Sequence, residues 1–129
     1  MSTNLQTLLA TLSPSLNPTE MVFCCLPEVD FTSSLKPFAI IRETEGWTVI
    51  IERSSAEKMG WEYSGIFCCI TLEVHSSLEA VGLTAVVSTT LAERGISANV
   101  VAGFHHDHIF VPASRANEAL EALLELAPT

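Results

Sequence analysis

Two segments of this chain recur, in the same order, in its second half. Val22–Leu26 (VFCCL) reappears as Ile66–Ile70 (IFCCI). Ile40–Ile51 aligns without a gap against Val100–Val111, and the segment between the two blocks is longer in the second copy than in the first. A repeat of this length is typical of a duplicated supersecondary unit. We therefore expect two copies of one fold, the second with an additional element.

The size of the chain favours two fused units over two independent ones. Each copy has about sixty residues, and a domain that small buries too little surface to be more than marginally stable alone. Apolar residues make up 48% of the 129 residues and charged residues 16%, a composition that favours an ordered globular protein. We expect the copies to share contacts.

The charge balance and the apolar runs exclude two classes of partner. The net charge is −9 with six Lys and Arg residues, whereas nucleic-acid affinity depends on basic residues that neutralise phosphates. No apolar run approaches the roughly 20 residues of a membrane helix. The N-terminus, Met1–Asn4, lacks the basic residues of a signal peptide. We predict a cytoplasmic protein with no nucleic-acid or membrane partner.

Four cysteines form two adjacent pairs, Cys24–Cys25 and Cys68–Cys69, inside strand-like segments. Neighbouring strand residues point to opposite faces, so one pair cannot direct both thiols at one metal. We interpret all four as buried, reduced, apolar residues. The alternative is a metal or redox cluster where the two pairs meet across paired strands.

Periodicity and turn residues divide the first copy into four elements. A stripe of Leu5, Leu8, Leu9 and Leu12 predicts a helix that Pro14 and Pro18 end. The expected elements are a helix over 5–12, a strand over 20–27, a hairpin over 38–53 and a brief helix, capped by Ser54 or Ser55, through Met59.

The second copy has the order β-α-β-β-α. The expected elements are a strand over 66–74, a helix over 83–94 with the stripe Leu83, Val86, Val87 and Leu91, a hairpin over 97–104 and 108–112, and a final helix capped by Ser114 with Ala116, Ala119, Leu120, Leu123 and Leu124 inward. Gly95 ends the first of these helices.

This order predicts an α+β protein of two tandem ferredoxin-like units, with antiparallel sheets and helices on one face. The other copy would supply the last strand, which the βαββα order of the second copy lacks. The first copy has no inter-strand helix, and we expect the N-terminal helix to take that place. With a boundary near Ser64, the units are 1–63 and 64–129.

The stretch Val81–Val101 resembles an ACT domain, with a Gly entering a helix, a Leu-Ala-Glu-x-Gly-Ile-Ser helix exit and an Asn leading the next strand. Together with His106–Pro112, it resembles small bacterial proteins of two tandem ACT-like units, of uncharacterised function, related to the regulatory ACT domains of aspartate kinases. The resemblance implies βαββαβ units that sense a ligand or regulate a partner.

In that family an effector amino acid lies between the first strand-to-helix loop and the second strand of a neighbouring module. The residues implied as ligand-binding are Glu73, Val81, Gly82, Leu83, Thr84, Ala85, Asn99, Val100 and Val101. Helix N–H groups would hold the carboxylate, and Glu73 or Glu79 the ammonium. The loop Ser76–Ala80 is longer than is usual, and the first copy has none, so at most one complete site per chain is implied, or one shared across a dimer.

Two other constellations suggest chemistry. His105–His108 invites a metal, but strand alternation divides these side chains, and the repeat aligns them with the turn at Glu45–Thr48. His75 beside Ser76 suggests a nucleophile with its base, yet no acid or oxyanion donor can be assigned. We therefore assign no catalytic residue, metal or cofactor.

The sequence favours a non-catalytic regulatory protein, a homodimer, that binds a small-molecule ligand, with an amino acid as the favoured effector. The alternative is a protein–protein interaction module without a ligand, in which exposed sheet edges pair with another chain. A third hypothesis is a metal-dependent enzyme that uses the His cluster.

Overall fold

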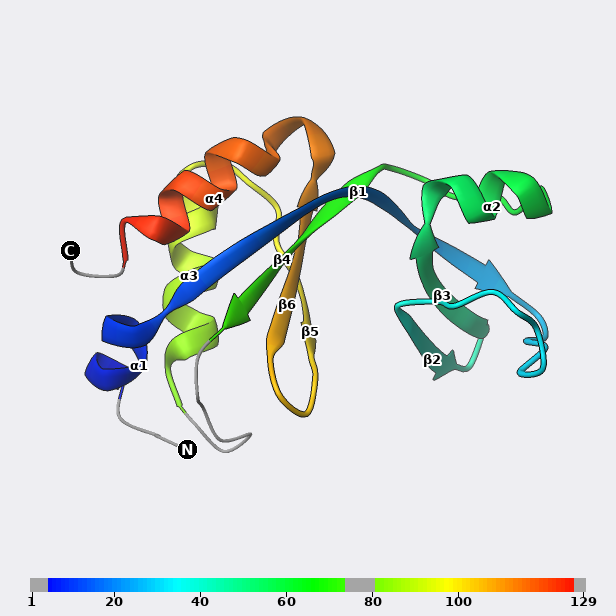
Figure 1. Ribbon diagram of the computed structural model, residues 1–129, viewed down its shortest axis with the longest axis horizontal. Coiled ribbons are helices and arrows are strands. Elements are labelled where there is room, and N and C mark those ends of the chain that lie inside the picture. The colour runs from blue at the N-terminus through cyan, green and yellow to red at the C-terminus, as the bar shows by residue number, and fades with distance from the viewer. Residues whose placement is uncertain (1–4, 74–80, 127–129) are drawn as a thin grey trace. The chain divides into compact units, whose positions relative to one another are not determined.

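A computed structural model describes residues 5–73 and 81–126 of the 129-residue chain (Figure 1). The helices and strands are α1 (Leu5–Thr11), β1 (Ser13–Leu26), β2 (Ala39–Glu43), β3 (Gly46–Glu52), α2 (Arg53–Met59), β4 (Phe67–Glu73), α3 (Leu83–Glu93), β5 (Asn99–Ala102), β6 (Asp107–Pro112), the 3-10 turn η1 (Ala113–Arg115) and α4 (Ala116–Leu124). None of the helices in the described ranges is both long and apolar enough to cross a membrane.

The chain forms two compact units. The central unit is Thr19–Phe67, and the composite unit joins the residues up to Pro18 to those from Cys68 onward. The units are α+β, with antiparallel hairpins and helices, as predicted. The division of the sequence into copies 1–63 and 64–129 stays a proposal about the repeat. The compact units are a different division, because they are defined by contacts between residues and group the first residues of the chain with the second copy.

The sheet of the composite unit has the strand order β1-β4-β6-β5, in which β1 contributes its residues up to Pro18. This is the order of a split βαβ sheet with a strand of the first copy in the place of the missing last strand. The prediction of a strand supplied by the other copy is therefore confirmed. Its physical basis is that β4, left without this neighbour, would expose unpaired backbone groups.

The composite core packs α1, α3 and α4 against one face of this sheet. Its buried members are Leu8, Leu12, Cys68, Ile70, Leu72, Leu83, Val87, Leu91, Ile96, Ile109, Val111, Ala116, Ala119, Ala122 and Leu123. Leu8, in α1, is fully buried here. The expectation that α1 fills the helix position of the first copy is therefore wrong. Because β1 begins at Ser13, directly after the end of α1 and Leu12, α1 stays with the part of β1 that pairs with β4.

The central unit has the strand order β2-β3-β1 and its own core of Val22, Cys24, Val49, Ile51 and Ala56. Its hairpin pairs Ile40 with Val49, and the hairpin of the composite unit pairs Val100 with Ile109. These are equivalent positions of the aligned repeats, so the two hairpins share one register. The gap-free alignment of the repeats is thus confirmed, and, as predicted, β2 follows β1 without an intervening helix.

Strand β1 is longer than the predicted strand over 20–27 and runs through Pro14 and Pro18. A proline cannot donate to a strand ladder, and it is tolerated where one edge of a strand needs no donors. The two prolines are separated by an even number of positions, so their missing N–H groups fall on the same edge of β1. Since β1 is the terminal strand in the order of the composite unit, only one of its edges has to pair with a neighbouring strand there, and the other edge tolerates the prolines.

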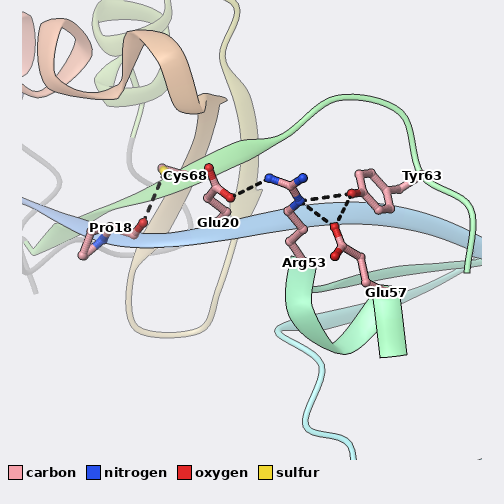
Figure 2. A network of polar contacts seen from close by, with 6 residues as sticks. All are labelled: Pro18, Glu20, Arg53, Glu57, Tyr63 and Cys68. Carbon is pink, nitrogen blue, oxygen red and sulfur yellow. Dashed lines mark hydrogen bonds and ion pairs between the residues drawn. The ribbon is translucent and has the colours of Figure 1, made fainter. Parts of the chain in front are cut away.

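Arg53 ties α2 to the rest of the central unit (Figure 2). Its Nη1 lies 2.9 Å from Glu20 Oε1 in β1, and its Nε lies 2.8 Å from Glu57 Oε1. The Tyr63 hydroxyl donates to the same Glu57 oxygen at 2.8 Å. These bonds hold the pKa of Glu57 below its usual value, Tyr63 contributing most and Arg53 next. Neither predicted serine caps α2, which follows β3 directly.

Candidate functional site

The residues predicted to bind a ligand all lie in the composite unit, and the start of α3 holds most of them. Gly82 is the N-cap with φ +101°, and the Val86 N–H donates to its carbonyl at 3.0 Å. The first N–H groups of a helix have no acceptor within the helix, and here they belong to residues 83–85. Thr84 and Ala85 are exposed, whereas the Leu83 side chain is buried in the core.

The strand residues of the predicted site lie at the other end of α3. Asn99 pairs with Phe110, shortly before η1, and Arg115 in η1 donates to the carbonyl of Arg94 at 2.9 Å, just beyond the last residue of α3. An 11-residue helix is about 16 Å long. In Figure 1 the chain leaves α3 at the end opposite its start and runs through a loop into β5. One chain therefore does not bring Asn99 to Gly82.

The remaining predicted residues have separate settings. Glu73 ends β4 and is exposed, and Val81 is 81% exposed. Val100 packs on the composite core and Val101 is half-buried. The Asn99 amide donates to the Phe110 carbonyl at 3.4 Å, which is a structural role. His75, Ser76 and Glu79 lie outside the described residues.

The histidines of the hairpin turn lie near one another, with ring centroids 6.3 Å apart for His105 and His106 and 6.5 Å apart for His106 and His108, but they differ in burial. His105 and His106 are exposed, whereas His108 on β6 is half-buried with Nδ1 2.9 Å from Thr71 Oγ1. Burial is the main cause that lowers the pKa of His108. Within the described ranges, no three His, Cys, Asp or Glu side chains are grouped to hold a metal ion.

The cysteine pairs alternate across the strands, as argued from sequence. Cys24 and Cys68 belong to the cores of their units, and Cys69 is buried, but Cys25 is exposed. The expectation that all four are buried is therefore wrong for Cys25, because that face of β1 is open at its position. Burial raises the pKa of the Cys24 and Cys69 thiols.

A pocket of about 500 Å³ in the central unit has no counterpart in the sequence predictions. Sheet residues form its floor, the loop between β1 and β2 forms one wall, and residues at and after the end of α2 form another. Its lining consists of Leu26, Pro27, Glu28, Val29, Asp30, Phe31, Ser33, Leu35, Pro37, Ile40, Val49, Ile51, Met59 and Trp61.

The repeat explains why this pocket exists. Its floor residues Ile40, Val49 and Ile51 correspond in the aligned repeats to Val100, Ile109 and Val111, which pack in the composite core with α3. The first copy has no helix between β1 and β2, and a loop covers the same face instead. The signal in the sequence was the persistence of apolar residues at these three positions in the copy that lacks the helix.

Comparison with known proteins gives two matches to the ACT domain, over residues 2–69 and 66–125. A Vibrio cholerae protein of unknown function, described as a possible transport protein, is 50% identical, with 96% of each chain covered and a TM-score of 0.87. No curated protein matches.

Two more distant solved structures share the fold. A protein from Agrobacterium tumefaciens is 15% identical, with 89% of this chain and 88% of that chain covered and a TM-score of 0.74. The ligand-free regulatory subunit of aspartate kinase from Thermus thermophilus is 11% identical, with 94% and 99% covered and a TM-score of 0.71.

Proposed function

Because this chain belongs to the ACT domain family, whose domains are commonly regulatory and ligand-binding, we propose that it is a non-catalytic regulatory protein that binds an amino acid. The observation that carries the proposal is that the two ACT matches together span residues 2–125. The likeness of its fold to a regulatory subunit of aspartate kinase agrees with this role. The proposal includes a cytoplasmic location, no catalytic residue and no cofactor.

The proposed ligand site is the start of α3. The N–H groups of residues 83–85 and the positive end of the helix dipole suit a carboxylate, and Gly82 lets the ligand approach the backbone. Exposed Glu73 suits the ammonium. Val81 lies beside them in sequence and is exposed.

The second half of this site would come from another module. Asn99, Val100 and Val101 lie at the opposite end of α3 in their own chain, so they can complete the site only in a neighbouring copy. We therefore propose a homodimer. A ligand at the dimer interface would bind one arrangement of the modules more tightly than another and so raise its population. The change in population is limited by the difference in affinity between the two arrangements.

A thermal-shift screen against the twenty amino acids tests this proposal. A ligand at 100 times its dissociation constant stabilises the native state by about 2.7 kcal/mol. Ala85→Glu places a carboxylate in the first turn of α3, where it suits the helix dipole but repels a ligand carboxylate. Ala85→Gln is the neutral control of the same shape. We expect one amino acid to raise the midpoint by several degrees, Ala85→Glu to abolish that shift, and Ala85→Gln to retain it.

The competing function is a protein-interaction module without a ligand. Exposed Ile41 on β2, which ends the strand order of the central unit, favours it. A flat amino-acid screen, together with a dimer whose dissociation constant no amino acid changes in analytical ultracentrifugation, would support this alternative.

A further inference from the structure

The pocket of the central unit has the size and lining of a small-molecule site. Its volume of about 500 Å³ falls within the range of roughly 300–1,000 Å³ that is usual for ligand pockets. Most of the lining is apolar, and Val49 and Ile51 in its floor are almost fully buried. Such a pocket favours an occupant with an apolar body.

The charged groups in the lining are of one sign. Glu28 and Asp30 contribute carboxylates, and none of the described lining residues is basic. Lys36 belongs to the same loop but does not line the pocket. The whole chain carries a net charge of −9, so the field around the pocket also favours a cation.

Asp30 is held in place as a carboxylate. Its Oδ1 accepts the Thr32 N–H at 2.9 Å and the Thr32 hydroxyl at 2.6 Å. These two bonds lower the pKa of Asp30, so it stays ionised well below neutral pH. Because both bonds end on one oxygen and come from its own loop, they fix the orientation of the carboxylate.

Aromatic rings add a second feature that suits a cation. Phe31 and Trp61 line the pocket, and the Phe31 ring, although 70% exposed, packs edge-on against Trp47 with centroids 5.7 Å apart. Faces of Phe and Trp rings attract ammonium groups. The apolar floor, the two aromatic rings and the two carboxylates of the lining together define the ligand chemistry.

We propose that this pocket binds a small amphipathic cation, a molecule with an apolar or aromatic body and one amine. This site differs from the start of α3 in position and in ligand, because it lies in the central unit and its carboxylates disfavour a free carboxylate on the ligand. It therefore goes beyond the proposed amino-acid site and does not depend on it.

Three indole compounds of graded charge test the proposal by isothermal titration calorimetry. Tryptamine carries an ammonium, tryptophan both charges, and indole-3-propionate a carboxylate. We expect tryptamine to bind at least about tenfold more tightly than indole-3-propionate, as two nearby surface carboxylates would produce. In a ¹H–¹⁵N NMR titration, the indole N–H signal of Trp61, one of two tryptophans, should shift on saturation.

A pair of double variants separates the pocket from the general charge of the protein. Glu28→Gln with Asp30→Asn removes the two pocket carboxylates, and Asp30→Asn keeps an oxygen that can accept both Thr32 bonds. Glu45→Gln with Glu62→Gln removes the same charge from exposed positions of the same unit outside the pocket. We expect the first to weaken tryptamine binding about tenfold and the second less than twofold.

Any of four results would overturn the proposal, the first three of them from the binding measurements. These are equal or tighter binding of indole-3-propionate, no tryptamine binding at millimolar concentration, and equal weakening by both double variants. The proposal would also be rejected if the NMR signal of Trp61 shifted with protein concentration and not with tryptamine, because the occupant of the pocket would then be a second copy of the chain. If a double variant fails to fold, the comparison of the three indole compounds on the native protein still tests the proposal. Ala85→Glu should leave tryptamine binding intact, so failure of the amino-acid site remains distinguishable.

Discussion

Gly82 serves the structure as well as the proposed site. Its φ is +101°, which side chains rarely adopt, and a Cβ there would lie 3.3 Å from Leu5 Cδ2 of α1. We expect Gly82→Val to lower the free energy of unfolding by about 1–3 kcal/mol in urea denaturation. An unchanged midpoint would show that the backbone at Gly82 relaxes freely. Loss of ligand binding in this variant alone would be ambiguous, which is why the Ala85 pair is the sharper test.

Glu57 should make part of the stability of the central unit depend on pH. Its folded pKa is held below the ordinary value of 4.5 by Tyr63 and Arg53. The carboxylate therefore stabilises the folded state above about pH 4.5, and this contribution is lost as the pH falls through the folded pKa. We expect Glu57→Gln to reduce the drop in thermal midpoint between pH 7 and pH 3. Glu45→Gln, an exposed glutamate of the same unit, should leave that drop nearly unchanged.

At the scale of elements, α3 shows how finely its buried face is defined. Val87 is fully buried in the composite core, whereas Val86 is only half-buried. We expect Val87→Asp to destabilise the protein by at least about 3 kcal/mol, because it buries a carboxylate among apolar side chains. Val86→Asp should cost clearly less. Chemical denaturation of both variants checks this order, and equal losses would mean that α3 is rotated about its axis relative to this structure.

The elements that the sequence predicts best are those it contains twice. Both hairpins have the register expected from the repeat, since Ile40 and Val100 occupy equivalent positions with equivalent partners. A short apolar run by itself fits either a strand or a buried helix, but the same side-chain alternation at two places in one chain favours a strand at both. Strand β1 was predicted too short because prolines usually end strands, and only its place in the strand order permits them.

The site was harder to predict than the fold because burial depends on what covers a face. Cys25 and Leu124 sit at positions whose pattern favoured burial, yet both are exposed. The pocket follows from a missing helix together with a loop whose path the residues alone do not specify. The approach of two distant segments, such as α1 and α3, is likewise a tertiary property.

At the scale of the whole molecule, the two copies have diverged in what covers equivalent sheet faces. In the composite unit α3 and α1 fill the core, and in the central unit a loop leaves a pocket. In our two proposals, the start of α3 binds a carboxylate and the pocket of the central unit binds an amine. If both proposals hold, the chain responds to two ligands of different charge, and their coupling is measurable as a mutual change in affinity.

The exchange of the first residues between copies makes a prediction about fragments. Fragment 64–129 contains the second sequence copy but lacks α1 and the strand segment 13–18 of the composite unit. Burial of Leu8 and Leu12 is worth about 1.5–3 kcal/mol each. Their loss, together with the missing strand, is comparable with the roughly 5–15 kcal/mol of a typical domain. We therefore expect fragment 64–129 to be largely unfolded by circular dichroism.

The matched control restores the missing segment. Residues 5–18, joined through a flexible Gly-Ser linker to residues 68–129, contain the described elements of the composite unit, so we expect this chain to fold cooperatively. If fragment 64–129 folds equally well, the second copy is self-sufficient, and α1 and residues 13–18 add little to its stability. If neither chain folds, the composite unit needs the covalent continuity of β1 into the central unit, and the two copies form one cooperative structure through that strand.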